Sequence, residues 1–272
     1  MDRRGVKTML IVLLAVTDIL LLGLWAVREL RAKAHRDEAA RLLISALSDA
    51  GLTASAESIS NQSGRVLEFI RNPQSESAAA LSILGECAAE DMGGGITQYR
   101  SALGYANFRD RGEFEIVLFQ PRVLNEGEIG TLAQRMGLGT ADATALERGE
   151  HGYTLLRYGE ALPVWGEQAV FLTDGEGRLI GVEGKWLIGD SYASAETQSR
   201  TSGWALLSLA YARSDAGMPA CALKEMSLGY LAESSSSGIM RLVPCWRINL
   251  TSDAGDESPT YVNAVTGEIA AL

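Results

Sequence analysis

Residues 195–250 read AETQSRTSGWALLSLAYARSDAGMPACALKEMSLGYLAESSSSGIMRLVPCWRINL. The first part predicts a helix over about 195–213, which is followed by Gly217, a residue type that commonly ends helices. Two runs of mainly apolar and β-branched residues, 220–231 and 239–250, then predict strands that are joined by a serine-rich turn. A helix followed by consecutive antiparallel strands predicts an α+β fold, with helices packed on one face of the sheets.

The preceding part of the chain has further signals for helices and strands. Asn72-Pro73 predicts an N-cap and a first helical residue, for a helix that continues to about Ala89. Asn125 and Glu128 resemble a capping box, which opens a helix to about Met136. The other predicted strands are, in order, 97–109, 113–120, 152–158, 169–173, 178–185 and 260–265.

A weak internal repeat links the two halves of the chain. The helical residues 80–84 precede a strand that contains Gly104-Tyr105, and residues 205–209 precede a strand that contains Gly229-Tyr230 in the same way. The repeat predicts two related subdomains, each made of antiparallel sheet with packed helices.

The N-terminal region contains a long apolar run. Residues 9–27 are nineteen amino acids whose strongly polar members are Thr17 and Asp18, and this length is about that needed to cross a bilayer. A cleaved signal peptide is the alternative, but the A-x-A sequence at 32–34 lies among charges outside the apolar run. We therefore predict an uncleaved transmembrane helix.

The charges around this run predict its orientation. A short tail with three basic residues would remain in the cytoplasm, and the large acidic body would lie outside the cell membrane. Leu43, Leu47 and Ala50 share one face of a charged stalk helix, and are expected to mark its contact with the first domain. The predicted division is a tail and anchor at 1–34, stalk and first subdomain at 35–123, and a second, PepSY-like subdomain at 124–272.

The composition excludes several classes of protein. The 272 residues are 47% hydrophobic, which excludes a fibrous or disordered chain, and the net charge of −10 argues against a nucleic-acid binder. Two histidines are too few for a histidine-rich metal site, and the three cysteines show no C-x-x-C spacing. Cys221 and Cys245 lie in neighbouring predicted strands, where they could be bridged or could be small buried residues. No cofactor is predicted.

A possible catalytic motif is Gly189-Asp190-Ser191, which is similar to the nucleophile block of some esterases. Such a serine needs a histidine base, which in those enzymes follows near the C-terminus. The last histidine here, His151, instead precedes Ser191 by forty residues. We therefore predict that the protein is not an enzyme, and an anchored serine hydrolase remains a remote alternative.

The C-terminal region carries a resemblance to a known family. Residues 244–248 read PCWRI, and residues 261–269 read YVNAVTGEI. This pair of strands resembles PepSY-like modules, and in particular the C-terminal part of the YycI family, which also begins with a Met-Asp-plus-basic tail such as residues 1–4. The middle of the chain departs from that pattern. The resemblance implies an extracytoplasmic accessory regulator of the membrane sensor histidine kinase that controls cell-wall metabolism in Gram-positive bacteria, with a related accessory membrane protein as a second partner.

Two groups of residues are the candidate contacts. Asp18, with Thr17 beside it, would hydrogen-bond a partner's transmembrane helix within the lipid bilayer. Trp246, Tyr261, Asn263 and Gly267 are structural or possible contact residues. Trp246 and Ile248 are expected on a buried strand face with Arg247 on the wet one, and Gly267 is expected to have positive φ. The alternative function is a membrane-tethered PepSY-like binder or inhibitor of an extracellular protease.

Overall fold

The computed structural model describes residues 38–60, 62–138, 146–186, 188, 191–234, 239–253 and 255–270, together with Leu21, Leu22, Leu24, Trp25, Arg28, Glu29 and His35. Thr17 and Asp18 of the predicted span, and Gly189 and Asp190 of the serine motif, lie outside these residues. Among the described residues, no helix is both long and apolar enough to cross a membrane.

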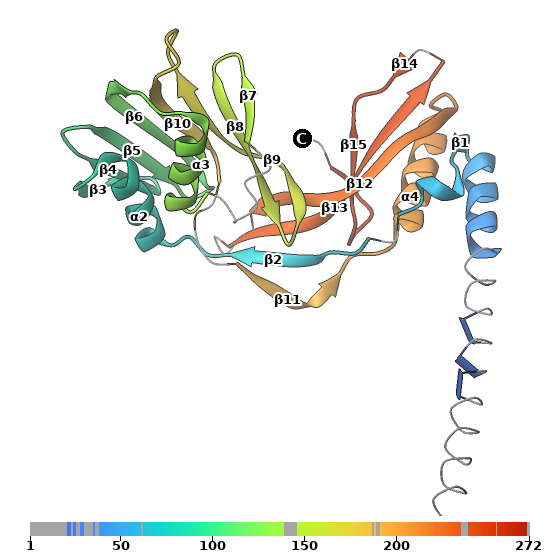
Figure 1. Cartoon of the computed structure of the whole chain (residues 1–272). Helices are drawn as coiled ribbons and strands as arrows, with labels where there is room; N and C mark the ends of the chain where they lie inside the picture. The colour runs from blue at the N-terminus through green and yellow to red at the C-terminus, as the bar shows by residue number, and fades with distance from the viewer. Residues whose placement is uncertain are drawn as a thin grey trace, which may run out of the picture.

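The fold is α+β, as predicted (Figure 1). Residues 38–49 are helical and precede the first strand. The other helices are the short 3-10 helix η1 (Ala56–Ser58), α2 (Pro73–Leu84), α3 (Glu126–Arg135) and α4 (Ser202–Asp215). The strands are β1 (Leu52–Thr53), β2 (Arg65–Phe69), β3 (Ala88–Gly93), β4 (Ile96–Arg100), β5 (Gly104–Arg109), β6 (Glu113–Arg122), β7 (Leu146–Gly149), β8 (Gly152–Gly159), β9 (Leu162–Thr173), β10 (Leu179–Lys185), β11 (Ser191–Gln198), β12 (Cys221–Ser234), β13 (Met240–Ser252), β14 (Gly255–Asp256), β15 (Thr260–Asn263) and β16 (Ile269–Ala270).

A single strand, β9, joins two sheets. The main path of hydrogen-bonded strands is β11-β2-β13-β12-β9-β10-β6-β5-β4-β3. Near Val164, β9 pairs in parallel with β12, and from Ala169 onward it pairs antiparallel with β10. Between these two parts, Gly166 has a φ of +76°, a conformation that glycine adopts readily. We call β1, β2 and β11–β16 the C-terminal sheet, and β3–β8 with β10 the N-terminal sheet.

Each sheet has its own hydrophobic core. In the N-terminal sheet, helices α2 and α3 bury Ile83 and Ile129 against strand residues such as Ile116 and Phe171. In the C-terminal sheet, α4 packs on the face that carries Trp246. These apolar faces explain why the strands alternate buried and exposed residues, most clearly along β6.

The helix at 38–49 packs against the C-terminal core. Leu47 is fully buried there, and Leu43 and Ala50 contact the same cluster. The prediction that this helix face meets the first domain is therefore wrong. The reason is the strand that follows, because β1 pairs in parallel with β12 and matches Leu52 with Cys221.

The predicted N-caps are confirmed. The Asn72 side chain accepts hydrogen bonds from Gln74 and Ser75 at the start of α2, and Asn125 and Glu128 form a complete capping box at α3. The helix prediction to Ala89 is wrong, because α2 ends at Leu84. Gly85 follows with a φ of +69°, and the chain then enters the edge strand β3.

Two other element boundaries differ from the prediction. The predicted strand 97–109 is a hairpin of β4 and β5, because residues 101–103 form a turn. The predicted helix from Ala195 begins at Ser202, because residues 191–198 form β11 and pair with β2. The predicted strands at 152–158, 220–231, 239–250 and 260–265, and the hairpin of 169–173 with 178–185, are confirmed within a few residues.

The sheets do not follow the predicted division between residues 123 and 124. Strands β1 and β2 come before this point and pair in the C-terminal sheet. Strand β10 comes after it and pairs with β6 in the N-terminal sheet. Each sheet is therefore built from both sides of the predicted boundary.

Candidate functional site

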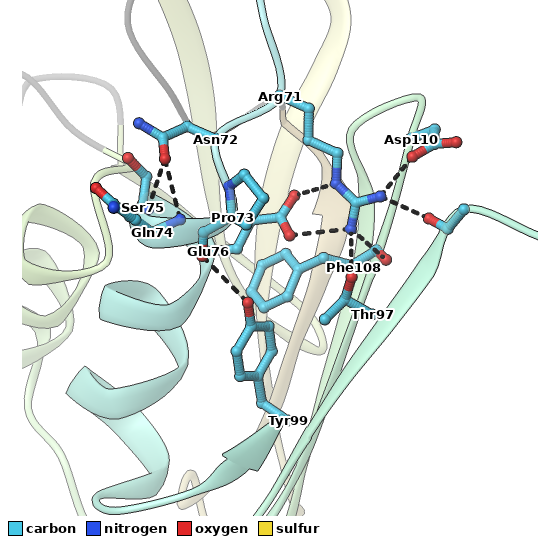
Figure 2. A network of polar contacts seen from close by, with 11 residues as sticks. Arg71, Asn72, Pro73, Gln74, Ser75, Glu76, Thr97, Tyr99, Phe108 and Asp110 are labelled. Atoms are coloured by element: carbon cyan, nitrogen blue, oxygen red, sulfur yellow. Dashed lines mark hydrogen bonds and ion pairs between the residues drawn. The ribbon is translucent and has the colours of Figure 1, made fainter. Parts of the chain in front are cut away.

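A polar network around Arg71 fastens α2 to the neighbouring hairpin (Figure 2). The guanidinium of Arg71 donates to both carboxylate oxygens of Glu76, at 2.7 and 3.0 Å, and Glu76 is only 3% exposed. The same guanidinium also donates to Asp110, to Thr97 Oγ1 and to the carbonyl oxygens of Gly95 and Phe108. Because every nitrogen of this arginine has a partner within the fold, the network is structural.

A second arginine lies between the two sheets. Arg157 on β8 forms an ion pair with Glu167 on β9, at 2.5 Å, and both side chains are almost completely buried. Its guanidinium carbon lies 4.3 Å from the ring centre of Phe69 and 5.6 Å from that of Trp186. Burial lowers the pKa of Arg157, although Glu167 acts in the opposite direction. This pair ties β2 to β8, β9 and the end of β10.

A third arginine, Arg247, lies in a row of side chains across the C-terminal sheet. Arg247 on β13 is paired in register with Ser227 on β12 and with Tyr261 on β15. Directly opposed residues point to the same side of a sheet, so these three side chains share one face. All three are half-buried. We call Ser227, Arg247 and Tyr261 the donor row.

An indole ring flanks the donor row. The guanidinium carbon of Arg247 lies 5.2 Å from the ring centre of Trp165, and the rings of Trp165 and Tyr261 are 6.3 Å apart. Trp165 can lie here because Gly229 has no side chain: a methyl group at that position would be 2.5 Å from Trp165 Nε1. The bend of β9 at Gly166 and the absence of a side chain at Gly229 therefore both contribute to the position of the Trp165 ring.

The polar groups of the donor row have no partner among the residues that the structure describes. Arg247 Nε is buried and makes no hydrogen bond, and the Arg247 side chain forms no ion pair in this part of the chain. By contrast, Arg213 binds Glu257, and Arg241 binds Glu68. An arginine stacked on an aromatic ring, whose terminal nitrogens have no partner among the described residues, can bind an anionic ligand but supplies no nucleophile.

The predicted contact residues separate into two sets. Tyr261 belongs to the donor row, but Trp246 lies on the opposite face, where it is fully buried against α4. Ile248 is buried with it as predicted. Arg247 is half-buried and stacked on Trp165, so the face that was expected to be wet is only partly open to solvent at this position.

Asn263 and Gly267 shape the turn after β15. The Asn263 side chain accepts hydrogen bonds from the backbone nitrogens of Val265 and Thr266, at 2.8 and 3.0 Å, and donates to Glu233. Gly267 has a φ of +83°, as predicted, and a methyl group there would be 2.4 Å from the ring of Trp204. Both residues therefore hold the turn against neighbouring elements.

Of the serine and cysteine candidates, Cys245 lies next to the donor row, because it is on β13 two residues before Arg247 and pairs with Gly229 and Asn263. Ser191 is on β11 opposite Phe69, whereas His151 is in the turn between β7 and β8 of the other sheet. Cys221 and Cys245 are both free and buried. Burial raises the pKa of Cys245 to about 12.

An open cavity of about 390 Å³ lies on the N-terminal sheet, and its lining includes Glu115, Glu183 and Arg109. Glu115 and Glu183 are directly opposed on β6 and β10. Within the described ranges, no group of three or more histidine, cysteine or acidic residues could hold a metal ion.

The prediction from sequence missed Trp165 and Ser227. Trp165 is brought to Arg247 by a parallel pairing between distant strands, which leaves no local pattern. The available signals were the glycine that follows this tryptophan within a strand, and the Gly229-Tyr230 pair in β12.

The chain matches no family model and no curated protein. Among solved structures, it is similar to an uncharacterized protein from Eubacterium rectale ATCC 33656, with 8% sequence identity and a TM-score of 0.39. The match covers 82% of this chain and 91% of that chain. The resemblance to the YycI family therefore stays a hypothesis.

Proposed function

We propose that the chain is a single-pass membrane regulatory protein whose extracytoplasmic body recognises a protein partner through the donor row. The observation that carries the proposal is the half-buried guanidinium of Arg247, which is stacked on Trp165 and has no hydrogen-bond or ion-pair partner among the described residues. Holding a cation in this way costs solvation free energy, which a bound ligand with negative charge would offset.

The packing of the helix at 38–49 supports a link between the anchor and this site. Leu43 and Leu47 contact the core that also contains Trp246, on the reverse side of the strand that carries Arg247. A transmembrane helix at residues 9–27, continuous with this stalk, would connect directly to the C-terminal sheet. Movement of a partner in the membrane would then reach the donor row through one packed core.

The partner is proposed from the resemblance to the YycI family, which implies a membrane sensor histidine kinase and a related accessory membrane protein. The weak repeat adds that the body consists of two related subdomains. Both subdomains would have a helix ahead of their strands, as α2 precedes β3–β6 and α4 precedes β12 and β13.

Photo-crosslinking in native membranes tests the proposal. A benzophenone amino acid placed at Tyr261 is expected to crosslink to the sensor kinase, identified by mass spectrometry. The same group placed at Tyr211, which is 58% exposed on α4, serves as the control and is expected to leave the kinase unlabelled. Equal crosslinking from both positions, or none from Tyr261, would contradict recognition through the donor row.

The membrane contact has a separate test. Asp18→Leu is expected to insert at least as well as the parent and to weaken copurification of the kinase, because it removes a polar group from the predicted span. Asp18→Asn is expected to retain most of the copurification, because the amide still forms hydrogen bonds. If Asp18→Leu retains full association and regulation, the span is only a tether.

The alternative function, a tethered inhibitor of an extracellular protease, predicts that inhibition survives replacement of the whole anchor by an unrelated apolar helix.

A further inference from the structure

We infer that the donor row binds a carboxylate group carried by a peptide segment of the partner. This inference rests on the proposed function and names the chemistry of the ligand at the same site. It follows from three properties of the site, which are its hydrogen-bonding groups, its charge and its aromatic flank.

The first property is that each member of the row can donate hydrogen bonds. Arg247 has donors only, and the hydroxyl groups of Ser227 and Tyr261 each have one donor proton. None of these three side chains makes a hydrogen bond to another described residue, and only Nε of Arg247 is sealed from solvent. Its two terminal nitrogens are therefore accessible to solvent, and such a pair of donors matches the two oxygens of a carboxylate.

The second property is the charge of the site. The nearby basic residues on β12 and β13 already have carboxylate partners, because Lys224 binds Asp256 and Arg241 binds Glu68. Glu225, two register pairs along the sheet, accepts a hydrogen bond from Asn249 and forms no ion pair with Arg247. Arg247 therefore supplies one positive charge without an ion-pair partner among the described residues, which matches a singly charged carboxylate better than a doubly charged phosphate.

The third property is the aromatic surface beside the charge. The guanidinium carbon lies 5.2 Å from the ring centre of Trp165, and the ring of Tyr261, which is opposite Arg247 in register, lies 6.3 Å from that of Trp165. Such rings offer apolar area to the backbone and methylene groups of a peptide next to its carboxylate. A small free acid would leave this area uncovered, so a peptide is the ligand that the whole site fits.

A titration of the full-length protein in detergent tests the inference. The protein is labelled with 5-fluorotryptophan, and the Trp165 signal is assigned with Trp165→Phe. The probes are acetyl-tetraalanine with a free C-terminal carboxylate, the same peptide as its C-terminal amide, acetate, and inorganic phosphate at equal ionic strength. The free-acid peptide is expected to shift the Trp165 signal saturably, with the amide inactive and acetate at least tenfold weaker.

Variants of two stacked arginines provide the matched comparison. Arg247→Gln is expected to weaken the binding of the free-acid peptide at least about tenfold, because it removes a charge-assisted hydrogen bond. Arg200→Gln is expected to leave it unchanged, since Arg200 also stacks on a tryptophan, Trp204, at 4.4 Å but lies outside the donor row. If Arg247→Gln does not fold, the comparison of acid and amide peptides on the parent protein still decides the question.

Several results would overturn the inference. Equal binding of the acid and amide peptides would show that no carboxylate is recognised, and stronger binding of phosphate would show that the site is built for another anion. Loss of binding in Arg200→Gln would place the ligand elsewhere. This outcome is separate from that of the crosslinking experiment. Kinase contact through Tyr261 without peptide binding would overturn only the inference that a carboxylate is recognised. Peptide binding without kinase contact would overturn only the proposed role of the kinase as partner.

Discussion

Removing one partner of the buried Arg157–Glu167 ion pair is expected to destabilise the junction between the two sheets. The side chains are 5% and 1% exposed, so Arg157→Met or Glu167→Gln would leave the other partner without its main countercharge and out of contact with water. Breaking a buried pair from one side typically costs about 3–5 kcal/mol. Arg157→Met would also remove the guanidinium from the rings of Phe69 and Trp186.

Thermal unfolding of the full-length protein, followed by circular dichroism, provides the measurement. For a chain of this size, 1 kcal/mol corresponds to a shift in Tm of about 2–4 °C, so each single variant is expected to lower Tm by about 6–20 °C. The double variant is expected to lose clearly less than the sum of the two single losses, because no unpaired charge remains. The control is Arg241→Met. Arg241 pairs with Glu68, but its side chain is 49% exposed, so losing this pair should cost about 1 kcal/mol of stability or less.

Two results would refute this reasoning. If either single variant shifts Tm no more than Arg241→Met does, the pair does not hold the junction. If the two single losses simply add in the double variant, the two charges do not act on each other in the folded protein.

The remaining predictions concern the C-terminal sheet. Trp246→Ala is expected to lower the free energy of unfolding by about 3–5 kcal/mol, as measured in urea, because the fully buried ring would leave a cavity; unchanged stability with lost partner binding would make it a contact residue instead. Gly267→Ala is expected to lower Tm more than Gly217→Ala, since both have positive φ but only a methyl group at 267 meets another side chain within 4 Å; equal shifts would contradict this. Burial raises the pKa values of Tyr230 and Cys245 to about 12, above their ordinary values of about 10 and 9. The stabilisation that comes from burying these neutral groups should therefore be fully present below pH 9 and be lost as pH rises toward 12. In thermal melts at alkaline pH, Tyr230→Phe should reduce this loss of stability.

Local signals predicted most elements of the fold. The caps at Asn72 and Asn125 are visible in sequence because they depend on residues within one helical turn. The strands β12 and β13 are long and apolar, so their existence was also clear. The start of α4 was predicted too early, because residues 191–198 contain no helix breaker and become a strand only through pairing with β2.

The candidate site was predicted only at Tyr261. Its other parts depend on distant pairings, which a single sequence does not display. Trp165 reaches Arg247 through the parallel contact of β9 with β12, and Ser227 is placed by the register of β12 against β13. Trp246 attracted attention as a motif residue, but the register puts it on the opposite face in the core.

The pairing of the first strands with the last ones has a consequence for assembly during synthesis. Leu52 pairs with Cys221 and Leu67 pairs with Leu242, so β1 and β2 emerge long before their partners exist. The meander of β3–β6 has neighbours that follow one another in the chain and can form first, because such contacts close short loops. The donor row therefore forms last, and chains released before β15 is made would lack Tyr261, one of its three members.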